Sequence, residues 1–328
     1  MNGKTDYQSI PNALLPGLIE YLTAKIGLHF SNRNRNELHQ KMAAAMMDFG
    51  FENVGEFIEW LLSSLPTQKQ IEILASHLTV GETYFFREKR AFEILEQSIL
   101  HRLIDARRKT GKRLRLWSAG CSTGEEPYSI AILLGKLIPD LKDWNITILA
   151  TDINTIALRK ADEGIYSDWS FRDTPPFFKD KYFETLNGNR YLLLSRIRKM
   201  VTFSYLNLSQ DVYPALQNNT NAMDIIFCRN VLMYFAPEHI KRAAERFYRS
   251  LVDGGCLIVS PVETSLINYE RFAAVRIQDS TFYKKDIHKT KPESLSAKNI
   301  EKVTAPYLLP PKRVDGLVKS QASLMQPL

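Results

Sequence analysis

Apolar residues between positions 12 and 79 recur at helical spacing. In the stretches LLPGLIEYLTAKIGL, VGEFIEWLLSSL and QIEILASHL, apolar side chains stand three or four positions apart, and Gly27, Gly50 and Pro66 interrupt the pattern. The alternation typical of strands is almost absent from this part of the chain. We therefore predict a small helical domain over residues 1–79. A segment over 80–111, with a helix from Arg90 to Lys109, links it to the rest of the chain.

Between residues 112 and 286, strand-like runs alternate with helical ones. The apolar runs RLRLWSAG, ITILATDI, VTFSYLNL, DIIFCRN and GCLIVSP are separated by helical patterns, two of which begin near Pro127 and at Pro237. This order predicts an α/β fold with a doubly wound, mostly parallel sheet that helices cover on both faces. The last two runs, FAAVRIQD and TFYKKD, are joined by a loop alone, which favours an antiparallel final strand. We also expect a short helix near Asp211.

Two segments depart from the alternation. At about residues 166–200 the pair Asn187-Gly188 stands between KYFETL and NRYLLLS, a signature of a tight β-hairpin, so we predict a β-subdomain inserted there. Residues 287–328 are rich in Lys, Ser and Pro and show little periodicity, which is typical of a flexible tail.

Composition and charge narrow the class of protein. The chain has 328 residues, 45% of them hydrophobic, with no apolar run of about eighteen residues and no signal-peptide pattern, so we expect a cytoplasmic protein without direct membrane insertion. Cys121, Cys228 and Cys256 are too widely spaced for a disulfide framework or a CxxC metal site, and we expect no bound metal. The net charge of +7 would permit anionic partners, yet residues 1–79 carry six basic against eight acidic side chains.

Polar residues follow the ends of the predicted strands, where parallel sheets bind their ligands. They are the Gly120–Gly124 turn with Glu125, then Asp152, Asn207 and Arg229-Asn230. Asp152 is placed to accept hydrogen bonds from ribose hydroxyls. A glycine turn before a helix usually holds phosphate, but Glu125 and Glu126 would repel a diphosphate. The residues therefore predict a ligand with an adenosine end and a cationic end, as in S-adenosylmethionine.

The two glutamates have different alternative roles. Glu126 stands three residues after Thr123, the spacing of a capping box, so it either meets the ligand or caps the helix. Glu125 lies directly beside the turn, and we predict that it contacts the ligand.

Four stretches in this order carry a resemblance to a known family. LTVGETYFFRE, WSAGCSTGEEPYSIA, ATDINTIALRKADEGIY and DIIFCRNVLMYF resemble motifs of the chemotaxis receptor methyltransferase family, the CheR type, over about residues 12–285. The resemblance implies a class I S-adenosylmethionine-dependent methyltransferase with a small N-terminal all-α domain and an inserted β-subdomain. It implies methyl transfer to glutamate side chains in the cytoplasmic helices of chemoreceptors, which yields methyl esters and S-adenosylhomocysteine.

The resemblance also implies roles for individual residues. Cofactor contacts fall on Gly81, Thr83, Arg87, Glu125, Asp152, Asn207, Leu208, Arg229 and Asn230. Arg87 and Tyr234 match positions that hold the substrate glutamate, as catalytic residues. The family often has Asn where this chain has Gly81, and its N-terminal basic helix is thinner here, with Arg33, Arg35 and Lys41. We expect a monomer.

Two other functions are compatible with parts of the sequence. A nucleic-acid methyltransferase would share the fold and suit a pI near 9.1, but the basic residues are not interleaved with a run of stacking aromatics, so we expect no nucleic acid partner. A signalling adaptor would bind the cofactor without turnover, yet Arg87, Glu125, Asp152 and Tyr234 are all present. An ionised carboxylate needs no general base to accept a methyl group, so alignment and exclusion of water would carry catalysis.

Overall fold

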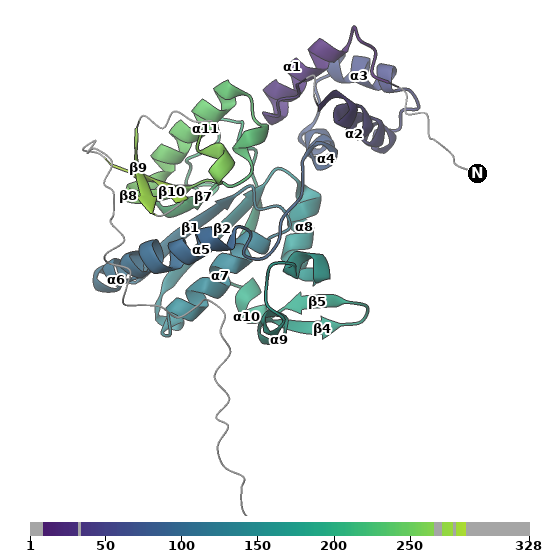
Figure 1. Cartoon of the computed structure of the whole chain (residues 1–328). Coiled ribbons are helices and arrows are strands. Elements are labelled where there is room, and N and C mark those ends of the chain that lie inside the picture. Colours follow the sequence, from purple (N-terminus) through teal and green to yellow (C-terminus); the bar gives the residue numbers. More distant parts are fainter. Residues whose placement is uncertain (1–8, 32–33, 266–270, 278–279, 287–328) are drawn as a thin grey trace, which may run out of the picture.

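The N-terminal part of the chain is helical, as the sequence predicts. The computed structural model describes residues 9–31, 34–265, 271–277 and 280–286. The N-terminal helices are α1 (Leu15–Ile26), α2 (Arg35–Asp48), α3 (Val54–Ser63) and α4 (Gln68–Leu78). Local signals set their starts, because the Asn53 side chain accepts hydrogen bonds from two N–H groups of α3, and Thr67 forms a capping box with Gln70 at α4. Figure 1 shows these helices grouped at one end of the molecule.

The predicted helix from Arg90 to Lys109 is present and continuous. It consists of α5 (Lys89–Ile94), a π-helical segment η2 (Leu95–Leu100) and α6 (His101–Thr110). Gly111 follows its last residue with a positive φ of 121°, which ends the helix before the first strand.

A seven-stranded sheet forms the centre of the fold, in the order β6-β2-β1-β7-β8-β10-β9. Its strands are β1 (Arg113–Ala119), β2 (Asn145–Asp152), β6 (Val201–Tyr205), β7 (Met223–Phe227), β8 (Leu251–Ile258), β9 (Phe272–Ile277) and β10 (Ser280–Lys285). The five strands from β6 to β8 pair in parallel, and β10 runs antiparallel to both β8 and β9. The mostly parallel sheet and the antiparallel end predicted from the sequence are both confirmed.

Helices cover both faces of the sheet (Figure 1). They are α6, α7 (Glu125–Leu137), α8 (Thr155–Glu163) and α11 (Pro237–Ser250). Short 3-10 helices follow strands or helices in the connecting loops: η3 (Leu141–Asp143), η5 (Leu232–Tyr234) and η6 (Pro261–Glu263). Successive strand residues bury on opposite sides: Leu116 packs with α5, α6 and α7, whereas Trp117 packs with Phe247 of α11. The interior residues of α1–α4 belong to the same cluster as Trp117. This shared core holds the N-terminal helices against the edge of the sheet, and the division at residue 79 stays a prediction.

The segment predicted as a β-subdomain forms a second, three-stranded sheet in the order β3-β5-β4. Its elements are β3 (Ile165–Ser167), η4 (Asp168–Phe171), α9 (Phe177–Tyr182), β4 (Phe183–Leu186), β5 (Arg190–Leu193) and α10 (Ser195–Arg198). The hairpin turn at Asn187-Gly188 is confirmed by the antiparallel pairing of Leu186 with Arg190. Phe85, from the segment before α5, stacks on Phe171 at 5.3 Å and so joins this sheet to the rest of the fold.

The short helix expected near Asp211 is wrong. Residues 206–222 form turns without a helix, and Asp211 instead accepts a hydrogen bond from Arg246 Nε at 2.9 Å. Pro214 and the neighbouring asparagines favour turns over helix in this stretch, which explains the difference. The tail predicted over 287–328 lies outside the described residues.

Candidate active site

A cavity opens where the carboxyl ends of the parallel strands meet the N-terminal helices. Its walls come from four parts of the chain: the α1–α2 region, the segment 78–87, the strand-end loops and the loop before η5. The predicted residues on its lining are Gly81, Thr83, Arg87, Asp152, Asn207, Leu208, Arg229, Asn230 and Tyr234. Glu126 is also on the lining, whereas Glu125 is not.

The glycine turn after β1 depends on the absence of a side chain at Gly120. This residue has a φ of +85°, and a Cβ here would lie 2.3 Å from Val231 Cγ2. The N–H groups of Gly120 and Cys121 donate to the Thr151 carbonyl at 2.8 and 3.0 Å, which ties the turn to the end of β2. Only glycine lets the backbone approach the loop of residue 231 this closely.

Asp152 is oriented by two backbone donors at the end of β2. Its Oδ2 accepts from the Ser122 N–H and its Oδ1 from the Asn154 N–H, both at 2.8 Å. Burial raises the pKa of Asp152, and the hydrogen bonds from Asn154 and Ser122 act in the opposite direction. The carboxylate is therefore held rigidly on the cavity wall with lone pairs left to accept further hydrogen bonds.

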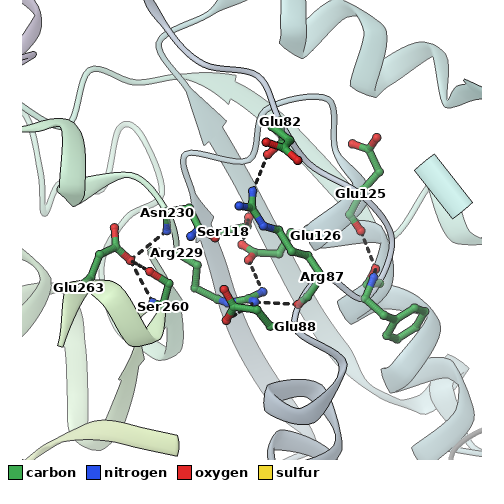
Figure 2. Close-up of polar contacts among 12 residues, drawn as sticks. Glu82, Arg87, Glu88, Ser118, Glu125, Glu126, Arg229, Asn230, Ser260 and Glu263 are labelled. Atoms are coloured by element: carbon green, nitrogen blue, oxygen red, sulfur yellow. Dashed lines mark hydrogen bonds and ion pairs between the residues drawn. The ribbon is translucent and has the colours of Figure 1, made fainter. Parts of the chain in front are cut away.

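Glu126 belongs to a buried charge group, not to a capping box. Its carboxylate accepts from Ser118 Oγ at 2.8 Å and from Arg229 Nη1 at 3.0 Å. Arg229 also lies 2.9 Å from Glu88, so its guanidinium is placed between two carboxylates (Figure 2). Burial raises the pKa of Glu126, while Arg229 opposes the shift. The capping-box alternative is wrong, because the N-cap of α7 is Gly124, with a φ of +92° and no side-chain cap.

Glu125 faces away from the cavity. Its Oε1 accepts from Ser170 Oγ at 2.9 Å and its Oε2 from Thr123 Oγ1 at 2.7 Å, and the residue is only 2% exposed. Figure 2 shows its carboxylate turned away from the group of Glu126 and Arg229. Since Ser170 lies in η4, Glu125 anchors the inserted subdomain to α7. The structure thus places Glu125 away from the ligand space, where the sequence predicted a contact, and places Glu126, whose role the sequence left open, on the cavity lining.

Arg87 and Tyr234 both line the cavity. The Arg87 guanidinium donates to the Glu82 carbonyl at 2.6 Å, and within the described ranges no carboxylate lies within ion-pair distance of it. Tyr234 is half-buried in η5, and its carbonyl accepts from the His29 N–H at 2.8 Å. Burial raises the pKa of the Tyr234 phenol, which stays protonated. The cavity lining therefore offers both a guanidinium with free donors and a phenol.

The other predicted residues build the walls in different ways. The Asn207 side chain is 1% exposed and is occupied by the Lys25 carbonyl and by Ser209, so it ties α1 to the sheet edge. At Gly81 a Cβ would meet only Ser122 Oγ, at 3.6 Å, so this part of the wall leaves open space. Asn230 has a φ of 58°, a left-handed backbone that its short polar side chain tolerates.

Several residues of the site were not expected from the sequence. Glu88 pairs with Arg229, Ser118 donates to Glu126, and Glu263 accepts hydrogen bonds from the loop after Arg229. Glu263 could have been found from the sequence, because Ser260-Pro-Val-Glu263 has the S-x-x-E spacing of a capping box, and the structure contains this capping box. Ser118 and Glu88 gave no such signal.

The donor set of the cavity suits S-adenosylmethionine. Asp152 provides an oriented carboxylate for ribose hydroxyls, and Glu126 provides negative charge that favours a cationic end over a diphosphate. Among the residues with defined positions, no group of three metal-binding side chains occurs, and no helix is long and apolar enough to cross a membrane.

Comparison with known proteins identifies the family. Residues 81–280 match the family described as CheR methyltransferase, SAM binding domain. The chain belongs to the CheR methyltransferase family. It is 34% identical to chemotaxis protein methyltransferase 2 of Vibrio cholerae over 277 aligned residues, and this alignment covers 84% of this chain and 94% of that protein. It is 32% identical over 252 residues to the chemotaxis protein methyltransferase of Borreliella burgdorferi, which covers 76% and 87% of the two chains.

Membership of the CheR family settles the class of protein. The chain is a methyltransferase whose cofactor is S-adenosylmethionine, and the cavity described above lies mainly within the matched domain. A solved magnesium protoporphyrin IX methyltransferase from Synechocystis, with bound SAM, shares 11% identity at a TM-score of 0.31 and covers 68% of this chain and 96% of its own, a likeness too weak to support the assignment.

Proposed function

We propose that this CheR-family methyltransferase transfers the methyl group of S-adenosylmethionine to glutamate side chains in the cytoplasmic helices of chemoreceptors. The observation that carries the proposal is Arg87, a guanidinium on the cavity wall that has no carboxylate partner among the described residues. The charge of Arg229, the other arginine on the lining, is already balanced by Glu126 and Glu88. Arg87 is thus the group that a substrate carboxylate would meet.

The cofactor, when bound, supplies a methyl group on a positively charged sulfur. Asp152 is the residue proposed to accept the ribose hydroxyls, because two backbone N–H groups fix its carboxylate. Glu126 is proposed to face the cationic end of the cofactor, and its own bonds to Ser118 and Arg229 keep it in place. Backbone and side-chain atoms at Gly81, Thr83, Asn207, Leu208 and Asn230 complete the proposed binding surface.

The substrate carboxylate is proposed to bind between Arg87 and Tyr234. A guanidinium can hold a carboxylate through two parallel hydrogen bonds, which fixes the direction of the attacking oxygen. The protonated phenol of Tyr234 can donate one more hydrogen bond. Because a carboxylate is ionised at neutral pH, these residues have to orient it and keep water away, not remove a proton.

The names of the relatives support the choice of substrate. The proteins from Vibrio cholerae and Borreliella burgdorferi are called chemotaxis protein methyltransferases, and they are similar to this chain over more than three quarters of its length. We extend this role to the present protein. We also propose that it acts in the cytoplasm, where the signalling helices of chemoreceptors lie. We propose that it acts as a monomer and on protein, not on nucleic acid.

Radiolabelled methyl transfer tests the proposal. The protein is incubated with methyl-labelled S-adenosylmethionine and either receptor cytoplasmic fragments or RNA, with Arg87→Ala as the matched control. We expect label on the receptor fragments and about a hundredfold less with Arg87→Ala. Label on RNA alone would support a nucleic-acid methyltransferase, and cofactor binding without any transfer would support an adaptor.

A further inference from the structure

A buried carboxylate, Glu263, lies under the loop that carries Arg229, Asn230 and Tyr234. It is the last residue of η6 and is fully buried, with an exposed fraction of 0%. It is not on the cavity lining, so it cannot touch the cofactor or the substrate directly. Neither the family match nor the resemblance of the sequence motifs accounts for it.

Glu263 collects the N–H groups of four consecutive residues. Its Oε1 accepts from Val231, Leu232 and Met233 at 2.8, 2.7 and 3.4 Å, and its Oε2 accepts from Asn230 at 2.9 Å. Ser260 adds its own N–H at 2.9 Å and its hydroxyl at 2.6 Å to Oε2. Figure 2 shows the carboxylate directed at Asn230 and Ser260, beside the Arg229 group.

These bonds replace the partners that regular structure would provide. Residues 230 and 231 follow β7, and residues 232 and 233 begin the 3-10 helix η5, so their N–H groups have no ladder or helical acceptor. Buried N–H groups need an acceptor, and here a single side chain serves them all. Within the described residues no lysine or arginine lies within ion-pair distance of Glu263, so its charge is balanced by oriented backbone dipoles.

The loop held in this way is strained and closely packed. Asn230 has a positive φ of 58°, and Val231 presses against the glycine turn so closely that a Cβ at Gly120 would lie 2.3 Å from it. The left-handed backbone at Asn230 persists where surrounding bonds enforce it, and the close contact of Val231 needs the loop to stay in place. Loss of the Glu263 anchor would therefore let the loop move, and the side chains of Arg229 and Tyr234 would move with it.

We propose that Glu263 is a positioning residue of the active site, which sets the loop 229–234 so that Arg229 and Asn230 meet the cofactor and Tyr234 meets the substrate. The part concerning Tyr234 rests on the proposed function. The part concerning the cofactor rests only on the family and on the contacts of the loop, and binding of S-adenosylhomocysteine measures it without any acceptor.

The test compares Glu263→Gln with Asp224→Asn. Glutamine keeps the shape of the side chain but turns one oxygen into an NH₂ donor that faces N–H groups. Asp224 is the matched control: a carboxylate that is 5% exposed, lies at the opposite end of β7 and accepts from Arg107 and the Arg115 N–H. Both variants lose a buried carboxylate, but only one of them holds the site loop.

The readouts are the Kd for S-adenosylhomocysteine by calorimetry, and kcat and KM with a receptor fragment, at a temperature where circular dichroism shows both variants folded. For Glu263→Gln we expect a Kd about tenfold higher and a kcat about a hundredfold lower, since displacement of site groups by about 1 Å has effects of this size. Asp224→Asn should keep both values within about twofold of the wild type.

Two results would overturn the proposal: wild-type Kd and kcat in folded Glu263→Gln, or the same losses in both variants, which would mean a merely structural role. If Glu263→Gln does not fold, Ser260→Ala replaces it, because it removes the hydroxyl that donates to Oε2 and so loosens the carboxylate that holds the loop. A severalfold higher Kd then supports the proposal, and an unchanged Kd refutes it. If the wild type binds S-adenosylhomocysteine but methylates no receptor fragment, the proposed function fails, while the Kd comparison still decides the role of Glu263.

Discussion

Replacement of Asp152 by asparagine changes one atom of the carboxylate that is proposed to bind the ribose. In the wild type both oxygens accept a backbone N–H at 2.8 Å, from Ser122 and Asn154. Asparagine keeps one acceptor and turns its NH₂ group toward the other N–H. It also removes the negative charge to which ribose hydroxyls would donate. The fold should persist, because the change removes the cost of burying a charge, the same burial that raises the pKa of Asp152.

The magnitude comes from the hydrogen bonds to the ionised group. Each such bond contributes about 1.5–3 kcal/mol, so losing the equivalent of one of them weakens binding by roughly 10- to 150-fold. The assay is titration calorimetry with S-adenosylhomocysteine. The matched control is Asp162→Asn, which changes the charge by the same amount on the exposed face of α8. A Kd for Asp152→Asn within about twofold of the wild type would refute the assignment of this residue.

The pH dependence of binding adds a second check on Asp152. Only the ionised form can accept two hydroxyl donors, and burial raises the pKa of this carboxyl, so affinity should fall as the pH is lowered from about 8 toward about 5. Asparagine cannot titrate, and the contribution of this residue should vanish in Asp152→Asn. The free energy of unfolding should change with pH in the opposite direction. A carboxyl whose pKa is raised in the folded state binds more protons there than in the unfolded state, so Asp152 destabilises the fold as the pH rises through that pKa.

Three further changes separate roles within the site. Glu126→Gln should raise the Kd for S-adenosylhomocysteine about tenfold. Glu125→Gln should instead lower the melting temperature and leave this Kd within about twofold, because its carboxylate bonds Ser170 and Thr123 away from the cavity. Equal effects of the two variants on the Kd would contradict the geometry. Arg87→Lys should reduce kcat/KM for a receptor fragment by about 10- to 100-fold and leave the Kd for S-adenosylhomocysteine unchanged, since lysine cannot bind a carboxylate bidentately. An unchanged kcat/KM in steady-state kinetics would mean that alignment by Arg87 is unimportant. Gly120→Ala should lower the free energy of unfolding by about 1–3 kcal/mol in urea titrations, while Gly135→Ala, in open space on α7, should raise it by about 0.5–1 kcal/mol; a neutral Gly120→Ala would contradict the close approach to the loop.

Periodicity and turn residues were sufficient to predict the layers of the fold. The helical spacing before residue 79, the strand–helix alternation and the Asn187-Gly188 hairpin depend on local physics, and the structure has each of them. The helix predicted near Asp211 is wrong because Pro214 and the neighbouring asparagines favour turns. The contact of Asp211 with Arg246, which is distant in sequence, is a long-range pairing that a local pattern cannot show.

The site itself was only partly predictable, for the same reason. Asp152 and Arg229 were located because parallel sheets bind ligands at the carboxyl ends of their strands, and topology alone brings these ends together. This rule did not tell Glu125 from Glu126, because adjacent residues at a helix start point in different directions, and which of them faces the cavity depends on Ser170 and Arg229. Glu263 was missed for a related reason: its capping-box spacing was local, but its bonds to residues 230–233 were not.

This CheR-family protein is expected to form methyl esters on glutamate side chains of chemoreceptors. Tandem mass spectrometry of a receptor fragment treated with the protein and S-adenosylmethionine tests it most directly, when combined with mild base and capture of volatile methanol. We predict an added methyl group on glutamate residues that base releases as methanol, and none with Arg87→Ala. A methyl group that resists base, or one carried by lysine, arginine or nucleic acid, would contradict the account.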